Sequence, residues 1–303
     1  MSEFSLPDND ESISLSSEEA LTLANELSEE LHGGAISCAD SRLIRKITAG
    51  LGDQRGRLRL TFTKSLASIG DAALPSLYRI LHHHHNVTAR RAAAKTLNLI
   101  SNPDALPYLL KAFMEDEDPV VQGSSAGAMA SIGPGAVDIF LGILVDPNCT
   151  PFQIGLANLG LSFIGAKAPQ ALRKAARSEH VEIRVAAISA LGDQIQSLKD
   201  DEAKTILIEA LDDPYPEVRS EAVTLFGRLY DSAEASPLLI RKLRDKEAQV
   251  RKNAAFSLMK LGVTSSIQPL KEAQNLEDMM DVSIIFQLAI NQLEKLSELD
   301  IIS

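Results

Sequence analysis

The chain has 303 residues, a net charge of −11 and a hydrophobic content of 45%. This apolar content excludes wholesale disorder, and the acidic balance argues against binding of nucleic acid through its phosphates. No run of about 18 apolar residues occurs, so we expect no membrane span. Two cysteines, Cys38 and Cys149, form no disulfide framework in a chain of this length, and the first 16 residues do not resemble a secretory signal. We therefore expect a cytoplasmic location.

The N-terminal 40 residues differ in character from the rest. Residues 1–15 are acidic and rich in serine, and we expect a disordered tail. Ser16 and Glu19 form a capping-box pattern that predicts a helix through Leu31, closed by Gly33. Residues 16–40 are thus an expected N-terminal capping region.

Residues 41–270 carry an internal repeat. Seven segments align on positions spaced 30 to 35 residues apart: Arg59, Arg90, Gln122, Ile154, Arg184, Arg219 and Arg251. Eleven residues after each anchor a helix is expected to end, at Gly70, Ser101, Gly133, Gly165, Ile195, Tyr230 and Gly262. The pattern resembles HEAT repeats. It predicts an all-α fold, a right-handed α-solenoid of about seven helix pairs with helical caps at both ends.

An aspartate stands six residues before several anchors, as in Asp213 before Arg219 and Asp245 before Arg251. We expect it to cap the following helix and to accept a bond from the Arg of an adjacent repeat. These residues therefore receive a structural role.

Residues 271–303 are the expected C-terminal capping region. A helix is predicted over Asp281–Leu299, and it should hide the last apolar face of the solenoid. The apolar residues assigned to that face are Ile284, Ile285, Leu288, Leu293 and Leu296.

Catalytic signatures are missing from the sequence. It contains no phosphate-binding loop, no nucleophile elbow and no Cys-x-x-Cys pair. The run His82–His85 is interpreted as an exposed turn between two helices, because consecutive side chains point in different directions and no further ligand lies nearby in sequence. We expect no metal site.

The solvent-facing side of the second helices is the most informative surface. It is expected one and five residues after each anchor, along the concave side of the solenoid. A basic edge of Lys64, Arg91 and Lys95 would then lie beside a floor of Gly123, Gly127 and Gly155. The glycines have three interpretations: approach of a flat, largely apolar ligand that carries carboxylates, low local stability, or close packing between helices.

Three glycine-rich segments give these repeats a family resemblance. Val121–Ala128, Ile154–Ala166 and Ala187–Gln194 resemble the E/F-type phycobilin lyases of cyanobacteria, most closely the branch that acts on phycoerythrin. The resemblance covers about Leu43 to Leu270. It implies a lyase that binds a linear tetrapyrrole (bilin), here phycoerythrobilin, and attaches it by a thioether to a Cys of an apo-phycobiliprotein subunit, here phycoerythrin.

The same resemblance implies partners, and together with the second-helix residues it leads to a hypothesis for their roles. The bilin is a substrate, no cofactor is permanently bound, and a second subunit of the family is a further candidate partner. Lys64, Arg91 and Lys95 would pair with the bilin propionates, and Asp118 or Glu221 would bind the pyrrole N–H groups. No catalytic signature is carried over. The alternative is a HEAT-repeat scaffold or chaperone that acts in phycobilisome assembly or degradation without attaching a bilin.

Overall fold

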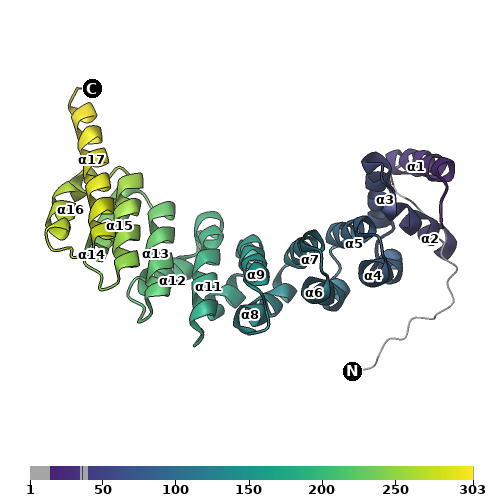
Figure 1. Cartoon of the computed structure of the whole chain (residues 1–303), viewed down its shortest axis with the longest axis horizontal. Helices are drawn as coiled ribbons and strands as arrows, with labels where there is room; N and C mark the ends of the chain where they lie inside the picture. Colours follow the sequence, from purple (N-terminus) through teal and green to yellow (C-terminus); the bar gives the residue numbers. More distant parts are fainter. Residues whose placement is uncertain (1–13, 35, 37–39, 303) are drawn as a thin grey trace. The chain divides into compact units, whose positions relative to one another are not determined.

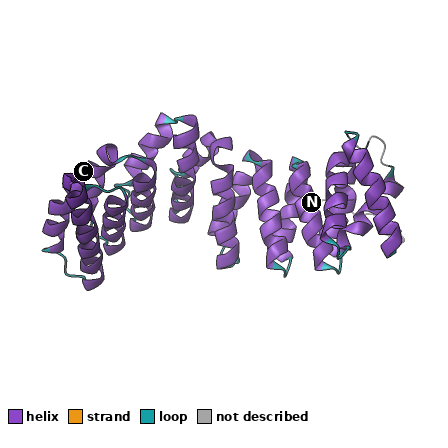
Figure 2. Ribbon diagram, turned by 90° about the horizontal axis from the view of Figure 1, so that it is seen from above, coloured by secondary structure: helices purple, strands orange, loops and turns teal. Residues whose placement is uncertain are grey.

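The fold is built from helices alone within the described residues. A computed structural model describes residues 14–34, 36 and 40–302, with side chains up to Glu298. Cys38 and the expected tail up to residue 13 lie outside this part of the chain. Figure 2 shows helices joined by short loops, without a strand in the part that is described. No helix there combines the length and apolar character that crossing a bilayer requires.

Seven helix pairs follow one another, as the repeat predicts, and the anchor of each repeat lies on the second helix of its pair (Figure 1). The pairs are α2 (Ser41–Ala49) with α3 (Gly56–Ile69), α4 (Leu74–His83) with α5 (Val87–Ile100), α6 (Leu106–Glu115) with α7 (Pro119–Ile132), α8 (Val137–Val145) with α9 (Pro151–Ile164), α10 (Pro169–Ala175) with α11 (Val181–Asp193), α12 (Asp201–Ala210) with α13 (Pro216–Leu229), and α14 (Ser232–Lys242) with α15 (Ala248–Lys260). Before them comes α1 (Ser17–His32), and after them come α16 (Ile267–Gln274) and α17 (Met280–Ile302).

These helices form two compact units. The first unit contains the described residues up to Ile139 together with Cys149–Gly160, and the second contains Phe140–Asn148 and the chain from Leu161 onward. The helices α8 and α9 contribute residues to both. The core of each unit is the apolar layer between neighbouring helices, with Phe62 and Phe113 fully buried in the first and Phe226 and Phe286 in the second.

The expected helix ends are confirmed where the backbone turns left-handed. Gly70, Gly133, Gly165 and Gly262 all have positive φ angles, and Ser101 adopts the same region at φ 52°. Glycine reaches this region without a steric penalty, which explains its recurrence at these ends. The expected end at Ile195 is wrong. There α11 runs on into a π-helical turn, Gln194–Leu198, and ends at Lys199 with φ 53°.

A ladder of arginine–carboxylate pairs joins several successive repeats, as expected, whereas Arg59 bonds within the described residues to the Asp53 carbonyl of its own turn. Arg219 donates from Nε and Nη2 to the two Asp245 oxygens at 2.9 and 2.7 Å, and from Nη1 to the Asp213 carbonyl at 2.9 Å. The equivalent pairs are Arg90 with Asp116, Arg184 with Asp213, and Arg251 with Glu277. The expectation that these aspartates cap the following helices is wrong. Asp213 and Asp245 accept from the N–H two residues further on, within the turn, and the N-cap residues Tyr215 and Glu247 make no side-chain cap.

The buried face of α17 also differs from the expectation. Against α15 and α16, the helix buries Val282, Phe286, Ala289, Ile290 and Leu293. Of the five residues assigned to that face only Leu293 is buried, whereas Ile284, Leu288 and Leu296 are exposed. Apolar residues occur on every side of this helix, so its periodicity did not define one face, and packing against α15 and α16 selects it.

Candidate functional site

The exposed side of the second helices in the first unit forms the candidate site. We call it the second-helix face, and its residues come from α3, α5, α7 and the part of α9 up to Gly160. It consists of Leu60, Lys64, Arg91, Lys95, Leu99, Gly123, Gly127, Phe152, Gly155 and Leu159. Neighbouring helices α3, α5 and α7 pack side by side, and Leu156 of α9 reaches α7 at Gly123. All six residues predicted for binding thus belong to one unit.

The charge on this face is positive although the chain is acidic. Lys64 and Lys95 are exposed on α3 and α5, and within the described residues neither forms an ion pair. Both α7 and α9 lack any charged side chain along their whole length. The face therefore offers two ammonium groups beside an uncharged strip, which suits a ligand that carries carboxylates on an apolar body.

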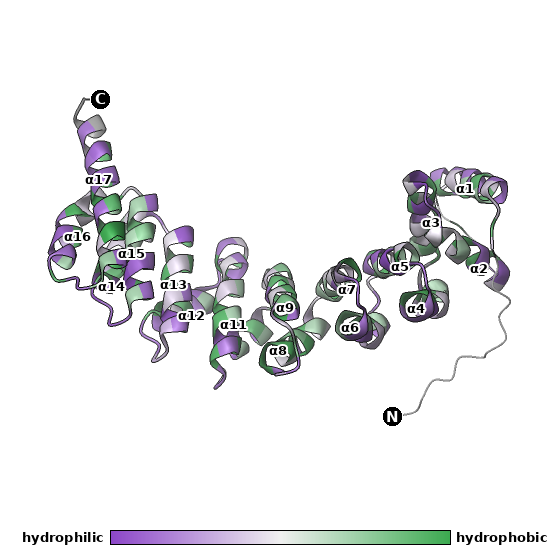
Figure 3. Cartoon of the chain, viewed as in Figure 1, coloured by the Kyte–Doolittle hydropathy of each residue, from purple (hydrophilic) through white to green (hydrophobic). Residues whose placement is uncertain are grey.

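Apolar side chains are exposed along the same face. Leu60, Leu99, Phe152 and Leu159 are each about half exposed, on α3, α5 and α9. Figure 3 shows that α9 is more apolar along its length than α5. Large exposed apolar side chains that share one face indicate a binding surface more often than single ones do.

Within the described residues, the glycines of the face have no close packing contact. A Cβ atom added at Gly127 or Gly155 would meet nothing within 4 Å, and at Gly123 it would meet only Leu156 Cδ2, at 3.8 Å. The close-packing interpretation of these glycines is therefore wrong. Each glycine leaves the helix backbone uncovered in the middle of a helix, and it lowers the stability by about 1 kcal/mol relative to alanine. Access to the backbone by something outside the described chain and low local stability are the interpretations that remain.

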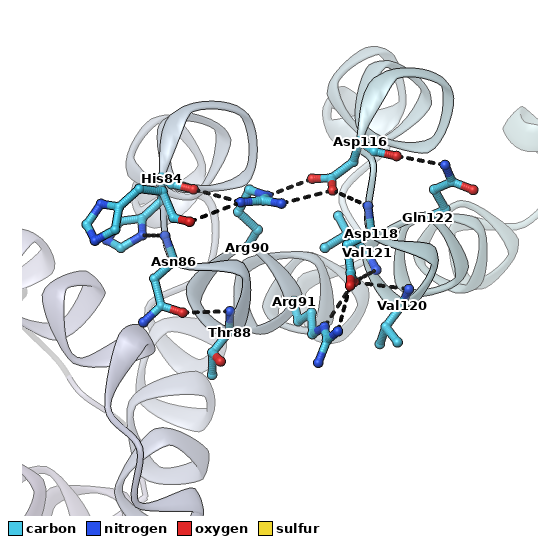
Figure 4. Close-up of polar contacts among 11 residues, drawn as sticks. His84, Asn86, Thr88, Arg90, Arg91, Asp116, Asp118, Val120, Val121 and Gln122 are labelled. Carbon is cyan, nitrogen blue, oxygen red and sulfur yellow. Dashed lines mark hydrogen bonds and ion pairs between the residues drawn. The ribbon is translucent and has the colours of Figure 1, made fainter.

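Arg91 is not the free cation that the sequence predicted. Its Nε and Nη2 donate to the Asp118 oxygens at 2.9 and 2.6 Å, and Asp118 caps α7 by accepting from Val120 and Val121 (Figure 4). The Arg91 guanidinium holds the pKa of Asp118 below its ordinary value, and the carboxylate raises the pKa of Arg91. The pair is neutral as a whole, so the cations of the face are Lys64 and Lys95. Asp118 stays ionised and suits an acceptor of N–H bonds rather than a proton donor.

Two other expectations from the sequence concern residues that are not part of this face. Glu221 lies on α13 of the second unit, so it is not grouped with the first-unit residues, and its role stays a prediction. Of the histidine run, only His84 and His85 lie in the turn, because α4 continues through His83. The Nδ1 atom of His84 accepts from the Asn86 N–H at 3.0 Å, and burial lowers the pKa of His82.

Sequence reasoning missed Leu99 and Phe152. It considered only the first and fifth residues after each anchor. Leu99 lies nine residues after Arg90, and Phe152 lies two residues before Ile154. Both positions continue the same helical stripe by a further step of three or four, so the spacing would have identified them.

Comparison with known proteins agrees with this architecture. The HEAT-repeat family profile matches residues 44–148, 154–223 and 205–278. The "Bilin biosynthesis protein MpeU" of Synechococcus sp. (strain WH8020) is 49% identical over 281 residues, which cover 93% of this chain and 95% of that protein. The chain belongs to this HEAT-repeat family of bilin biosynthesis proteins.

More distant similarities are consistent with the family. An "Uncharacterized phycocyanin operon protein Z" of Pseudanabaena tenuis (strain PCC 7409) is 31% identical over 127 residues, 39% of this chain and 62% of that protein. Among solved structures, Kap121p bound to Nup53p has a TM-score of 0.54 at 13% identity, covering 92% of this chain and 38% of that one. This last similarity shows a shared helical-repeat fold alone.

Proposed function

We propose that this chain is a bilin lyase. It binds phycoerythrobilin on the second-helix face and attaches it by a thioether to a Cys of an apo-phycoerythrin subunit. Membership of the bilin biosynthesis family supports the ligand class. The observation that carries the site is the combination of bare, uncontacted Gly127 and Gly155 with the exposed Lys64 and Lys95. The proposed location is the cytoplasm.

The chemistry of a bilin matches this face in three respects. Its conjugated rings form a flat apolar body, which Phe152 and Leu159 would contact and the glycines would let approach the helix backbone. Its two propionates carry the negative charges that Lys64 and Lys95 would pair with. Its pyrrole N–H groups need acceptors, and the Oδ2 atom of Asp118 accepts only from Arg91 among the described residues.

The proposed reaction needs no nucleophile from this chain. The thiol of the partner's Cys adds across the exocyclic double bond of the terminal bilin ring. A carbon–sulfur bond forms, and the displaced electron pair takes up the proton that the thiol gives up, so neither an oxidant nor a leaving group is required. This chain holds and orients the bilin, and orientation alone accelerates such an addition strongly.

Charge reversal of the two lysines tests the site. The double variant Lys64→Glu/Lys95→Glu should weaken bilin binding by about tenfold or more, measured by absorbance titration of the purified protein. The control Lys174→Glu/Lys260→Glu makes the same change in net charge at exposed positions of the second unit and should bind normally. Equal effects of the two double variants would show that overall charge, and not this face, governs binding.

Co-expression with apo-phycoerythrin subunits and a bilin source tests the activity. A lyase yields a coloured subunit that stays coloured in denaturing acid and has the native absorbance. A scaffold or chaperone without attachment activity leaves the bilin free or bound at random cysteines. In the latter outcome the lyase proposal fails, while the binding site is still judged by the titration.

A further inference from the structure

A row of unpaired cations begins where α1 begins. Arg55, the N-cap residue of α3, donates from Nη1 and Nη2 to the Ser17 carbonyl at 3.2 Å, so the start of α1 lies beside the start of α3. Arg57 and Lys64 are exposed on one side of α3, two turns apart, and Lys95 is exposed on the neighbouring α5. We call Arg57, Lys64 and Lys95 the cation row. Within the described residues, none of the three forms an ion pair.

The described carboxylates near this row are already engaged. Asp53 is held by Arg55 at 2.6 Å, and Asp118 is held by Arg91 at the same distance. Glu19 accepts from the N-cap backbone N–H in the capping box of α1. The cation row therefore keeps its positive charge against the described part of an acidic chain, and its complement has to come from elsewhere.

The segment that precedes α1 has the matching composition. Residues 3–13 lie outside the described residues, and their sequence contains no basic side chain. Acids alternate there with apolar side chains, and the second-helix face likewise combines cations with exposed leucines. The acids are Glu3, Asp8, Asp10 and Glu11, and the apolar residues are Phe4, Leu6 and Ile13.

The segment is also long enough to lie along the row. Lys64 is about 13 Å along α3 from the start of that helix, and Lys95 is one helix further, about another 8–10 Å away. Glu11 and Asp8 lie six and nine residues before the start of α1. An extended chain covers about 3.3 Å per residue, so these acids can reach about 20 and 30 Å from that point. Both lysines are within this range.

We propose that residues 3–13 fold back onto the second-helix face of the same chain and pair with the cation row. Covalent attachment gives the segment an effective concentration on the order of millimolar, so weak pairs at exposed positions are sufficient. Lys64 and Lys95 are also the cations assigned to the bilin propionates, so the segment and a bilin compete for one face. The competition rests on the proposed function, whereas the contact between the segment and the face does not.

Acetylation of lysines in the purified full chain, without any bilin, tests the contact. The comparison is between the wild type and Asp8→Asn/Asp10→Asn/Glu11→Gln, which we call the acid-neutral variant. Lys64 and Lys95 should react about fivefold faster in this variant, measured by mass spectrometry, because the segment then covers them for a smaller fraction of the time. Equal rates in the two proteins would overturn the proposal.

Two controls separate the contact from other effects of charge. The variant Glu179→Gln/Glu182→Gln/Glu217→Gln makes the same change in net charge at exposed positions of the second unit, and Lys64 and Lys95 should react in it as in the wild type. The rates should also be equal at about 1 and about 50 µM protein, since the contact lies within one chain. Faster lysine acetylation in this control, or protection found only at the higher concentration, would contradict the fold-back.

Absorbance titration with phycoerythrobilin tests the competition. The acid-neutral variant should bind about fivefold more tightly than the wild type, because its face is free for a larger fraction of the time. The second-unit control should bind like the wild type. Equal affinities of the acid-neutral variant and the wild type would overturn the competition. If neither protein binds the bilin, the proposed function fails, and the acetylation rates still decide whether the segment covers the face.

Discussion

Alanine at the bare glycines of the second-helix face should make the protein more stable and less able to bind a bilin. Gly127 and Gly155 lie inside α7 and α9, and a methyl group at either would meet nothing within 4 Å. Replacement by alanine removes backbone freedom from the unfolded chain without a clash in the folded one. Each substitution should raise the free energy of unfolding by about 0.5–1 kcal/mol, and the pair by about 1–2 kcal/mol.

The expected loss of binding comes from the same two methyl groups. A flat ligand that contacts the helix backbone would be held away from it by a methyl's thickness at two points. We expect affinity for the bilin to fall by about tenfold, equivalent to about 1.4 kcal/mol. Urea denaturation followed by circular dichroism gives the stability, and absorbance titration gives the affinity.

Two other glycines provide matched controls. Gly142 of α8 also has nothing within 4 Å of an added Cβ, so Gly142→Ala should stabilise equally and leave binding unchanged. At Gly227 of α13 the added Cβ would lie 2.4 Å from Ser257 Cβ, so Gly227→Ala should destabilise. A loss of stability on Gly127→Ala or Gly155→Ala would refute the absence of a packing role. A gain in stability with unchanged binding would show that the ligand does not approach the glycines.

Three further outcomes follow from the contacts described above. Arg219→Ala should lower the free energy of unfolding by about 3 kcal/mol, because it removes both guanidinium bonds to Asp245, which is 7% exposed and is left with Lys242 at 3.9 Å. Arg241→Ala, at a pair exposed to solvent, should change the free energy of unfolding by less than about 1 kcal/mol, and equal changes of the two variants in urea denaturation would contradict this. The Arg251 guanidinium lowers the pKa of Glu277 in the folded protein. The stability that the Glu277 carboxylate contributes is therefore complete above its unfolded pKa, near 4.5, and is lost as the pH falls through its lower folded pKa. Glu277→Gln should flatten the acid limb of a plot of unfolding midpoint against pH, and an unchanged limb would contradict this. Phe152→Ser should weaken bilin binding in the absorbance titration. Because the Phe152 ring is about half exposed, the free energy of unfolding should change by no more than about 0.5 kcal/mol. A large destabilisation would show that the ring is part of the core.

The repeat and its helix ends were predictable because they depend on local chemistry. A left-handed helix end favours glycine whatever lies around it. The arginine anchors recur because each bonds to its own turn, and Arg90, Arg184, Arg219 and Arg251 also bond to a carboxylate of the following segment. Ile195 was placed wrongly because a π-helical turn depends on how an insertion of several residues is accommodated, and residue type does not reveal that.

The sequence predicted which residues group together in the candidate site, but not which of its charged side chains are already paired with one another. The spacing along the second helices placed Lys64, Lys95 and the three glycines on one face, and the structure shows all five at exposed or half-exposed positions of the first unit. Pairing between Arg91 and Asp118 joins side chains 27 residues apart, so it depends on the stacking of two repeats. For the same reason the buried face of α17 follows from its contacts with α15 and α16 and not from its own periodicity.

Every arginine–carboxylate link of the ladder spans only 26 to 29 residues of sequence. A nascent chain therefore completes each link as soon as the next helix pair leaves the ribosome, without waiting for the C-terminus. Low contact order of this kind favours rapid, stepwise folding from local nuclei. The links of the ladder can accordingly form one after another during synthesis, beginning with Arg90 and Asp116.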